Sequence, residues 1–391
     1  MDNYKNIINL FLDKTKTIIS QYPISFGEVS ECKDGLYFSN ENKGKMKDFM
    51  DIMNWTTSFF SGMALLSYQT SGDTTFLQWV NSKNNLYHAK VFVHSEDTMH
   101  DLGFLYSLHS VAIYKITGDP YSREIALKAA DELAKRFVLK GGYIEAWGRM
   151  NRTIPEHLSK EEGNNHFYSE SQGLAIIDCM MNLPLLYWAW SETGNPFYRD
   201  IANSHADMTA QLFIREDASV YHAYRFDPVS GKPIGGCNYC GFGNESYWAR
   251  GTTWAIYGFV IAYSYTHNPV FLELSIKIAK GFIAQLTHED SVPVWDFRLP
   301  KGQEPNKDTS AAVIAASAFF EIIKYQREVE LEKYAYLILD AITDERYTNY
   351  DINVPGILKE QNGKNVYTSF GDYFYYEAIC KACEIKRDLY W

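Results

Sequence analysis

The chain has 391 residues, of which 46% are hydrophobic and 22% are charged, and its formal net charge at pH 7 is −11. This composition is ordinary for a globular protein, and the acidic balance without a basic stripe argues against nucleic-acid binding. Because no low-complexity run or Gly/Ser linker marks a boundary, we expect one domain over residues 1–391.

The N-terminal segment, residues 1–20, predicts an amphipathic helix. Apolar residues such as Ile7, Phe11 and Ile18 alternate with Asp and Lys, so the uninterrupted apolar run of a signal peptide is missing. We therefore expect a cytoplasmic protein with no membrane partner, present as a monomer or a weak homodimer.

A joint between two helices recurs in the segments that start at residues 68, 114, 190, 263 and 325. In the copy at 114, Gly118 can end one helix in the left-handed conformation, Asp119 can cap the next helix, and Pro120 fits its first turn. The spacing leaves room for a helical hairpin between successive joints. Repeated hairpins of this kind indicate a helical solenoid or a closed ring.

Strand signals are sparse, apart from a predicted β-hairpin over 219–236 that turns at Ser230-Gly231. The chain also carries 29 Tyr, 23 Phe and 9 Trp, which suits a cleft that stacks on sugar rings. We therefore predict an all-α fold, the (α/α)6 barrel, with six helical hairpins around a central cleft and a small β-hairpin insertion.

One acid stands in an almost wholly apolar stretch, "GLAIIDCMMNLPLLYWAW", residues 173–190. A carboxylate at Asp178 has to find a strong partner or take up a proton. The stretch is too short and too interrupted for a membrane span, so it predicts a core-facing helix. Asp178 is either a structural acid or a catalytic one.

Two further clusters contain candidate site residues. His100 and Asp101 precede an apolar helical stretch in which Gly103 permits the close approach of a backbone or a ligand, although Asp101 could simply stabilise a helix N-terminus. In "GNESYWARGTTWAIYGF", residues 243–259, Arg250 needs an anionic or carbonyl partner between two tryptophans. That partner is either a structural carboxylate or the carboxylate of an acidic sugar.

The six cysteines include two C-x-x-C pairs, Cys237/Cys240 and Cys380/Cys383. The pairs lie much farther apart than the roughly 15–20 residues that separate the pairs of local zinc ribbons. We therefore expect structural thiols in a reducing compartment and no metal site.

Six segments in order, from about Trp55 to Ala378, resemble the unsaturated glucuronyl hydrolases of glycoside hydrolase family 88. They are "HDLGFLYSL", "IIDCMMNLPLLYWA", "NESYWARGTTWAIYGF", "VPVWDF", "KDTSAAVIAASAFFEI" and "FGDYFYYEA". The resemblance implies the (α/α)6 barrel, Asp178 as acid/base and Asp101 as its partner. It also implies these substrate-binding residues: Trp55, His100, Trp147, His222, Trp248, Arg250, Trp254 and, more weakly, Tyr373.

The implied reaction is a hydration that needs no cofactor. An acid protonates C4 of a 4,5-unsaturated uronic acid at the non-reducing end of a lyase-generated glycosaminoglycan disaccharide, from chondroitin, hyaluronan or heparin. Water adds at C5, and the hemiketal opens to release the partner sugar. Apolar surroundings and a neighbouring Asp101 would raise the pKa of Asp178, as this acid requires.

The chain departs from the family pattern near its C-terminus. Relatives that accept sulfated disaccharides carry Ser-x-x-Ser-x-Lys, whereas this chain has "KEQNGK". This segment keeps Lys364, which the resemblance implies as a further substrate-binding residue, but has Lys359 and Asn362 in place of the serines. Three alternative functions remain: an unsaturated rhamnogalacturonyl hydrolase acting on pectin-derived disaccharides, a sugar epimerase using His100 or His222, and a non-catalytic sugar-binding protein.

Overall fold

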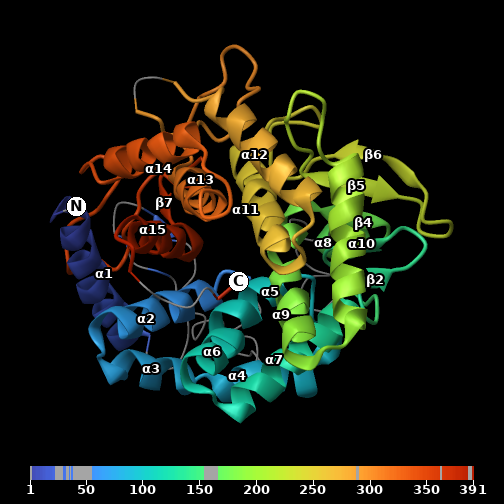
Figure 1. Ribbon diagram of the computed structural model, residues 1–391, viewed down its shortest axis with the longest axis horizontal. Helices are drawn as coiled ribbons and strands as arrows, with labels where there is room; N and C mark the ends of the chain where they lie inside the picture. The colour runs from blue at the N-terminus through green and yellow to red at the C-terminus, as the bar shows by residue number, and fades with distance from the viewer. Residues whose placement is uncertain are drawn as a thin grey trace.

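Helices dominate the computed structural model of the chain (Figure 1). The structure describes residues 2–22, 30–31, 35, 37, 55–153, 166–287, 290–361, 363–385 and 390–391. The predicted N-terminal amphipathic helix is present as α1, Asp2–Gln21. Asn362 lies outside the described residues.

The predicted joints end and start helices as expected. Gly118 adopts φ 73° at the end of one helix, and the Asp119 carboxylate accepts the N–H groups of Tyr121 and Ser122 in the next. Asn195 and Asn268 cap their helices in the same way. Each joint therefore makes a tight helical hairpin.

Two classes of helix follow from burial. One class is buried on nearly every face and forms an inner ring: α2 Ser58–Ser71, α5 Leu102–Tyr106 continuing through a π-helical turn into α6 Ala112–Thr117, α9 Leu183–Thr193, α11 Ala249–Thr266, α13 Thr309–Ile322 and α15 Ser369–Ala382. The other class buries one face only: α1, α3 Thr74–Asn81, α4 Asn84–Phe92, α7 Pro120–Ala134, α10 Pro196–Leu212, α12 Pro269–Ile283 and α14 Val329–Ile342. A short α8, His166–Ser169, lies outside both classes.

The inner helices contact one another in a closed circle, which Figure 1 shows down its axis. Helix α15 packs on α13 and on α2, so the last inner helix meets the first. Within the described residues each inner helix has an outer partner, and the six pairs are α2/α3, α6/α7, α9/α10, α11/α12, α13/α14 and α15/α1. The predicted (α/α)6 barrel is confirmed.

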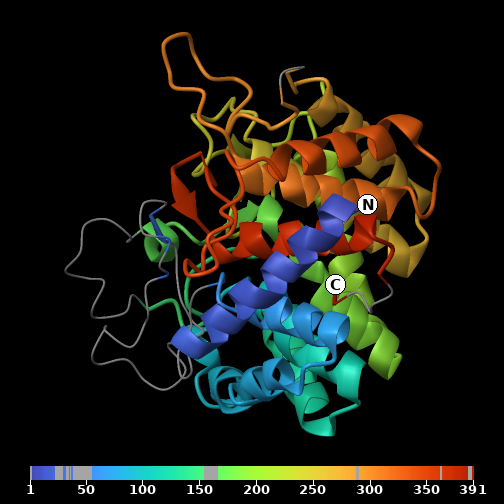
Figure 2. The same cartoon turned by 90° about the vertical axis from the view of Figure 1, so that its left-hand side faces the viewer.

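Short strands decorate this ring. The predicted hairpin is confirmed as β5 Ala223–Phe226 and β6 Pro233–Cys237, and β4 Leu174–Ile176 adds a third antiparallel strand. Two further pairs are β2 Phe137–Val138 with β3 Tyr143–Ile144, and β1 Ser30–Glu31 with β7 Val366–Tyr367. Strand β7 lies toward the left-hand end of the ring in Figure 2.

The prediction of one helix over 173–190 is wrong in its first half. Strand β4 is followed by a 3-10 turn, Ile177–Met181, and only then by helix α9. Pro184 explains the boundary, because it lacks an N–H donor and fits the first turn of a helix. Asp178 therefore lies in a turn between a strand and a helix.

A membrane-spanning helix would have to be both long and apolar. Within the described part of the chain no helix meets both conditions.

Candidate active site

Asn182 holds together the two segments that carry Asp101 and Asp178. Its side-chain oxygen accepts the Phe104 N–H at 2.9 Å, and its amide nitrogen donates to the Asp178 carbonyl at 3.2 Å. Gly103 makes this approach possible, because a Cβ there would lie 2.2 Å from the Asn182 Cα. The close contact foreseen at Gly103 is therefore with a backbone.

Both candidate acids have raised pKa values. Burial raises the pKa of Asp101 to about 7, and the charge of Asp178 adds to the effect. Burial also raises the pKa of Asp178 to about 6, although Arg250 and the Trp254 indole act in the opposite direction. The side chains of Asp101 and Asp178 keep 18% and 16% of their surface exposed, so both acids are accessible to a small molecule.

The sheet places His222 beside Asp178. Strand β4 pairs with β5, and the Ile177 N–H donates to the His222 carbonyl at 2.9 Å. The His222 Nε2 then lies 3.7 Å from Asp178 Oδ2, an oxygen that accepts no hydrogen bond from the described protein groups. His222 Nδ1 accepts the Tyr239 N–H at 3.0 Å, so its own proton is on Nε2 and points toward Asp178.

His100 repeats this arrangement beside Asp101. Its Nδ1 accepts the Trp147 N–H at 3.2 Å, and its Nε2 lies 3.2 Å from Asp101 Oδ1. Burial lowers the pKa of both histidines, and nearby cations lower it further. Each acid is thus faced by the N–H of a neutral imidazole whose tautomer is set by a backbone donor.

Arg136, which sequence reasoning missed, joins two loops of the site. Its guanidinium donates to the carbonyls of Thr98, Trp147 and Gly148, and its Nε donates to the Glu145 carbonyl. Thr98 precedes the His100-Asp101 pair, so this one side chain fixes Trp147 relative to Asp101. A lone arginine after a helix gives no sequence signal of such a role.

The sequence left open whether Arg250 pairs with a structural carboxylate or with a sugar carboxylate, and in the structure it pairs with the carboxylate of Asp308. Its Nη1 donates to Asp308 Oδ2 at 2.9 Å, and the side chains of Arg250 and Asp308 are 8% and 0% exposed. The guanidinium also lies over the rings of Trp248, at 4.7 Å, and Phe370, at 5.3 Å. This ion pair does not remove Arg250 from the site, because its charge lowers the pKa of both Asp178 and His222.

The tryptophans gather at the same place but differ in exposure. Trp55 is half-buried and stacks on Phe370, with ring centroids 5.0 Å apart. Trp248 is buried and contacts His222 edge to face. Trp254 is fully buried against Phe104 and Phe374, so its ring belongs to the floor below Asp178 and cannot stack on a sugar.

Two predicted binding residues lie elsewhere. Tyr373 is buried in the aromatic core, where its hydroxyl donates to Glu377 at 2.7 Å, so the described contacts do not bring it to the two acids. Lys364 is exposed in a separate groove of about 540 Å³, together with Lys307, Arg346 and Glu360. The described contacts do not bring Lys364 to the two acids.

The cysteine pairs have different surroundings. Cys380 is buried on α15, and Cys383 follows at the end of that helix. Cys237 ends β6, and the exposed Cys240 completes the turn whose backbone N–H at Tyr239 holds His222. The turn that contains the first pair therefore belongs to the candidate site through its backbone.

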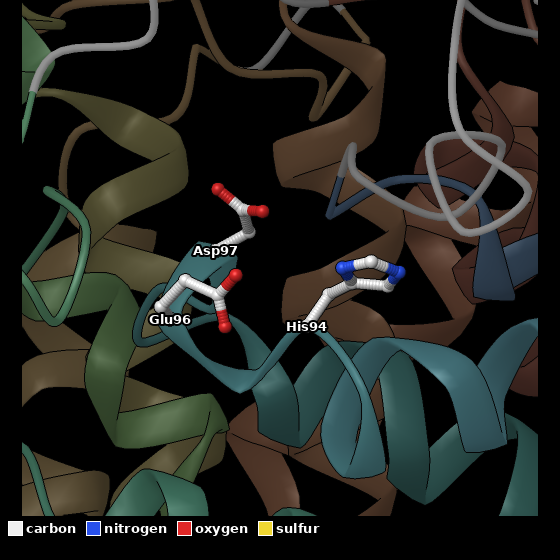
Figure 3. A group of neighbouring side chains, drawn as sticks. All are labelled: His94, Glu96 and Asp97. Carbon is white, nitrogen blue, oxygen red and sulfur yellow. The ribbon is translucent and has the colours of Figure 1, made fainter.

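His94, Glu96 and Asp97 were not foreseen as a group, but their donor atoms lie within 4.8 Å of one another. Figure 3 shows the three side chains projecting from the turn that follows α4. Asp97 already forms an ion pair with Arg149. Because its carboxylate is neutralised by an arginine, we assign no metal to this group.

Comparison with known proteins extends these findings. The chain matches Glycosyl Hydrolase Family 88 over residues 33–368. It is 34% identical over 345 residues to an unsaturated chondroitin disaccharide hydrolase of Streptococcus pyogenes serotype M1, covering 85% of this chain and 82% of that protein.

Solved structures agree with the sequence match. The unsaturated glucuronyl hydrolase from Bacillus sp. GL1 superposes with a TM-score of 0.84 at 31% identity, over 97% of this chain and 96% of that one. A mutant unsaturated glucuronyl hydrolase from Streptococcus agalactiae, complexed with dGlcA-GalNAc6S, superposes with a TM-score of 0.78 at 27% identity, over 99% of this chain and 93% of that one. This protein belongs to glycoside hydrolase family 88.

Proposed function

We propose that this protein is an unsaturated glucuronyl hydrolase. Its substrate is a glycosaminoglycan disaccharide with a 4,5-unsaturated uronic acid at the non-reducing end. The observation that carries the proposal is the pair Asp101 and Asp178, two accessible carboxyl groups with pKa values raised to about 7 and about 6. An acid that must protonate carbon near neutral pH needs a pKa in this range.

Asp178 is the proposed proton donor. Its Oδ2 accepts no hydrogen bond from the described protein groups, so a proton on this carboxyl is available to a ligand. Transfer of that proton to C4 draws the enol-ether electrons away from C5, where positive charge develops. Water then adds at C5 and gives up a proton to a carboxylate of the pair, and the hemiketal opens to release the partner sugar.

The neutral imidazoles of His100 and His222 would assist the reaction without gaining or losing a proton. Each directs an Nε2–H toward one acid, so each stabilises that acid when it is ionised after proton transfer. This argues against the epimerase alternative, in which a histidine would itself accept and donate the proton, because burial lowers the pKa of both histidines.

Arg250 is the proposed binding group for the uronate carboxylate. Its Nη1 donates to Asp308, and the hydrogen bonds described for its guanidinium involve Nη1 alone. A charge-assisted bond from the other nitrogens of the guanidinium would hold the substrate carboxylate close to Asp178. Trp55, the accessible tryptophan of the group, offers its ring to the sugar.

A direct test is to mix the protein with lyase-generated disaccharides from chondroitin, hyaluronan, heparin and pectin. Turnover removes the conjugated double bond and therefore its ultraviolet absorbance. We expect turnover of glycosaminoglycan disaccharides, in keeping with the names of the relatives. Faster turnover of the pectin-derived disaccharide would instead support the rhamnogalacturonyl alternative, and no turnover of any would support a binding protein.

The same panel tests sulfate tolerance. The segment 359–364 lacks both serines of the Ser-x-x-Ser-x-Lys pattern. We therefore expect an unsulfated chondroitin disaccharide to react faster than its 6-sulfated counterpart. Equal rates would show that other groups of this chain accept the sulfate.

A further inference from the structure

We infer that Asp308 is a positioning residue for substrate recognition, acting through Arg250. The inference rests on the proposed function, because it assigns a role to Asp308 only if Arg250 binds the uronate carboxylate. It goes further than the proposed function, because it names the residue that determines which guanidinium nitrogens of Arg250 are available to the substrate.

The two oxygens of Asp308 have separate partners. Oδ1 accepts hydrogen bonds from the Ala311 N–H, at 3.1 Å, and from the Ser310 hydroxyl, so Asp308 caps the start of helix α13. Oδ2 accepts Arg250 Nη1 at 2.9 Å. Because Asp308 is 0% exposed and anchored by the helix start, its Oδ2 is a fixed point against which Arg250 of α11 is oriented.

Aromatic rings complete this support. The Arg250 guanidinium lies over the Trp248 ring at 4.7 Å and the Phe370 ring at 5.3 Å. The rings hold the guanidinium plane, and Asp308 fixes the rotation of the guanidinium within that plane by taking Nη1. Because Nη1 is taken by Asp308, the remaining nitrogens of the guanidinium are left for the substrate carboxylate.

Charge gives Asp308 a second effect. A lone buried arginine beside Asp178 would stabilise the ionised form of an acid that has to be protonated. The Asp308 carboxylate offsets that cation within one ion pair. Arg250, paired with Asp308, can therefore offer hydrogen bonds to the substrate carboxylate while lowering the pKa of Asp178 less than an unpaired arginine would.

The test separates capping from positioning. Asp308→Asn keeps a side chain that caps helices about as well as Asp, but it removes the charge and the fixed acceptor for Arg250. With an unsaturated disaccharide we expect kcat/KM to fall about 10- to 100-fold, mainly through KM. With the methyl ester of the same uronic acid, which Arg250 binds only weakly, we expect a change of less than about threefold.

A double-mutant cycle adds a second readout. In an Arg250→Ala background, Asp308→Asn should cause little further loss, because a residue that acts through Arg250 has nothing left to position. Asp119→Asn is the matched control: Asp119 caps α7 with the same type of bond but has no arginine partner, and its variant should retain wild-type kinetics.

Equal losses on the acid and the ester, or additive losses in the cycle, would overturn the inference and leave Asp308 as a helix cap. Wild-type kinetics in a folded Asp308→Asn variant would overturn it too. These outcomes differ from failure of the proposed function, in which the wild-type protein itself would not consume unsaturated glycosaminoglycan disaccharides.

Discussion

At the scale of single residues, Asp178 combines two properties that usually exclude each other. It is an acid with little exposed surface, and yet its Oδ2 accepts no hydrogen bond from the described protein groups. Structural buried carboxylates normally accept hydrogen bonds, as Asp308 does from a backbone N–H, a hydroxyl and a guanidinium. The absence of such a bond at Asp178 Oδ2 favours a catalytic role over a structural one.

Asp178→Asn should lower kcat by about 10²- to 10⁴-fold, because the amide keeps the shape of the side chain but cannot donate the proton. Binding should survive, since Arg250 remains, and the variant should retain intact unsaturated disaccharide in equilibrium dialysis. A folded variant with near wild-type turnover would show that Asp178 is a structural acid.

The pH profile of the wild-type protein should follow the acid pair. Because the donor must be protonated, activity should fall as the pH rises through about 6 to 7, the range of the two raised pKa values. The interacting pair titrates as a unit, so the profile reports apparent values that belong to both residues. Activity that stays constant up to pH 9 would contradict a protonated carboxyl as donor.

Asp178→Asn should make the folded protein more stable than wild type at high pH. The folded-state pKa of Asp178, about 6, lies above the value of about 3.9 in an unfolded chain. Protonated Asp178 therefore stabilises the folded state at low pH, and this stability is lost as the pH rises through about 6. At pH 8 we expect Asp178→Asn to be more stable than wild type by about 1–3 kcal/mol, and near pH 4 the difference should vanish. Thermal unfolding at both pH values measures this, and a pH-independent difference would contradict it.

The sequence motifs predicted the residues of the candidate site, but not the residues that hold them in place. Most of the predicted residues gather around the two acids, because the resemblance covered them motif by motif. The bond from the Tyr373 hydroxyl to Glu377 could not be predicted, because a tyrosine on a buried helix looks the same in sequence whether it faces a site or an internal carboxylate. Arg136, Asp308 and Asn182 were missed as partners because their contacts join segments far apart in the chain.

At the scale of elements, the contact between α5 and the start of α9 aligns the acids. The backbone of Asn182 occupies the space that a side chain at residue 103 would need, and α9 begins at Leu183 with Pro184 in its first turn. The expectation of a single helix failed because apolar periodicity cannot distinguish a short buried strand from a buried helical turn. Pairing with β5, which decides the matter, lies more than forty residues away.

Gly103→Ala tests this contact. The new Cβ would lie 2.2 Å from the Asn182 backbone, so α5 has to move away from the Asp178 turn. We expect a loss of stability of about 1–3 kcal/mol and a lower kcat, since Asp101 moves with α5. Gly235→Ala is the control, because its Cβ would meet no atom within 4 Å. Unchanged stability and kinetics of Gly103→Ala would show that the contact is not tight.

At the scale of the whole molecule, the ring brings together acids from different helical pairs. Asp101 precedes α5, Asp178 precedes α9 and Asp308 precedes α13, so each charged residue stands at the start of an inner helix. Charge as a whole works against the proposed substrate, because a net charge of −11 repels an anion. Attraction therefore has to be local, which gives Arg250 its importance.

Removal of metal ions should have no effect. The Asp97 carboxylate of the group with His94 and Glu96 is paired with Arg149, and Cys380 is buried among apolar side chains. We expect EDTA to leave both activity and the melting temperature unchanged, and elemental analysis to find no stoichiometric zinc. A lower melting temperature that zinc restores would show that one of these groups holds a structural ion.

The sequence by itself determined the helical pairs and their joints, because Gly, Asp or Asn, and Pro act on the backbone within a few residues of their own position. Its ordered motifs also predicted the residues of the candidate site. Tertiary structure alone decided which oxygen of Asp308 meets Arg250, which nitrogen of each histidine carries the proton, and how closely Asn182 approaches Gly103. These features depend on contacts between segments that lie far apart in the chain and meet only in the folded protein.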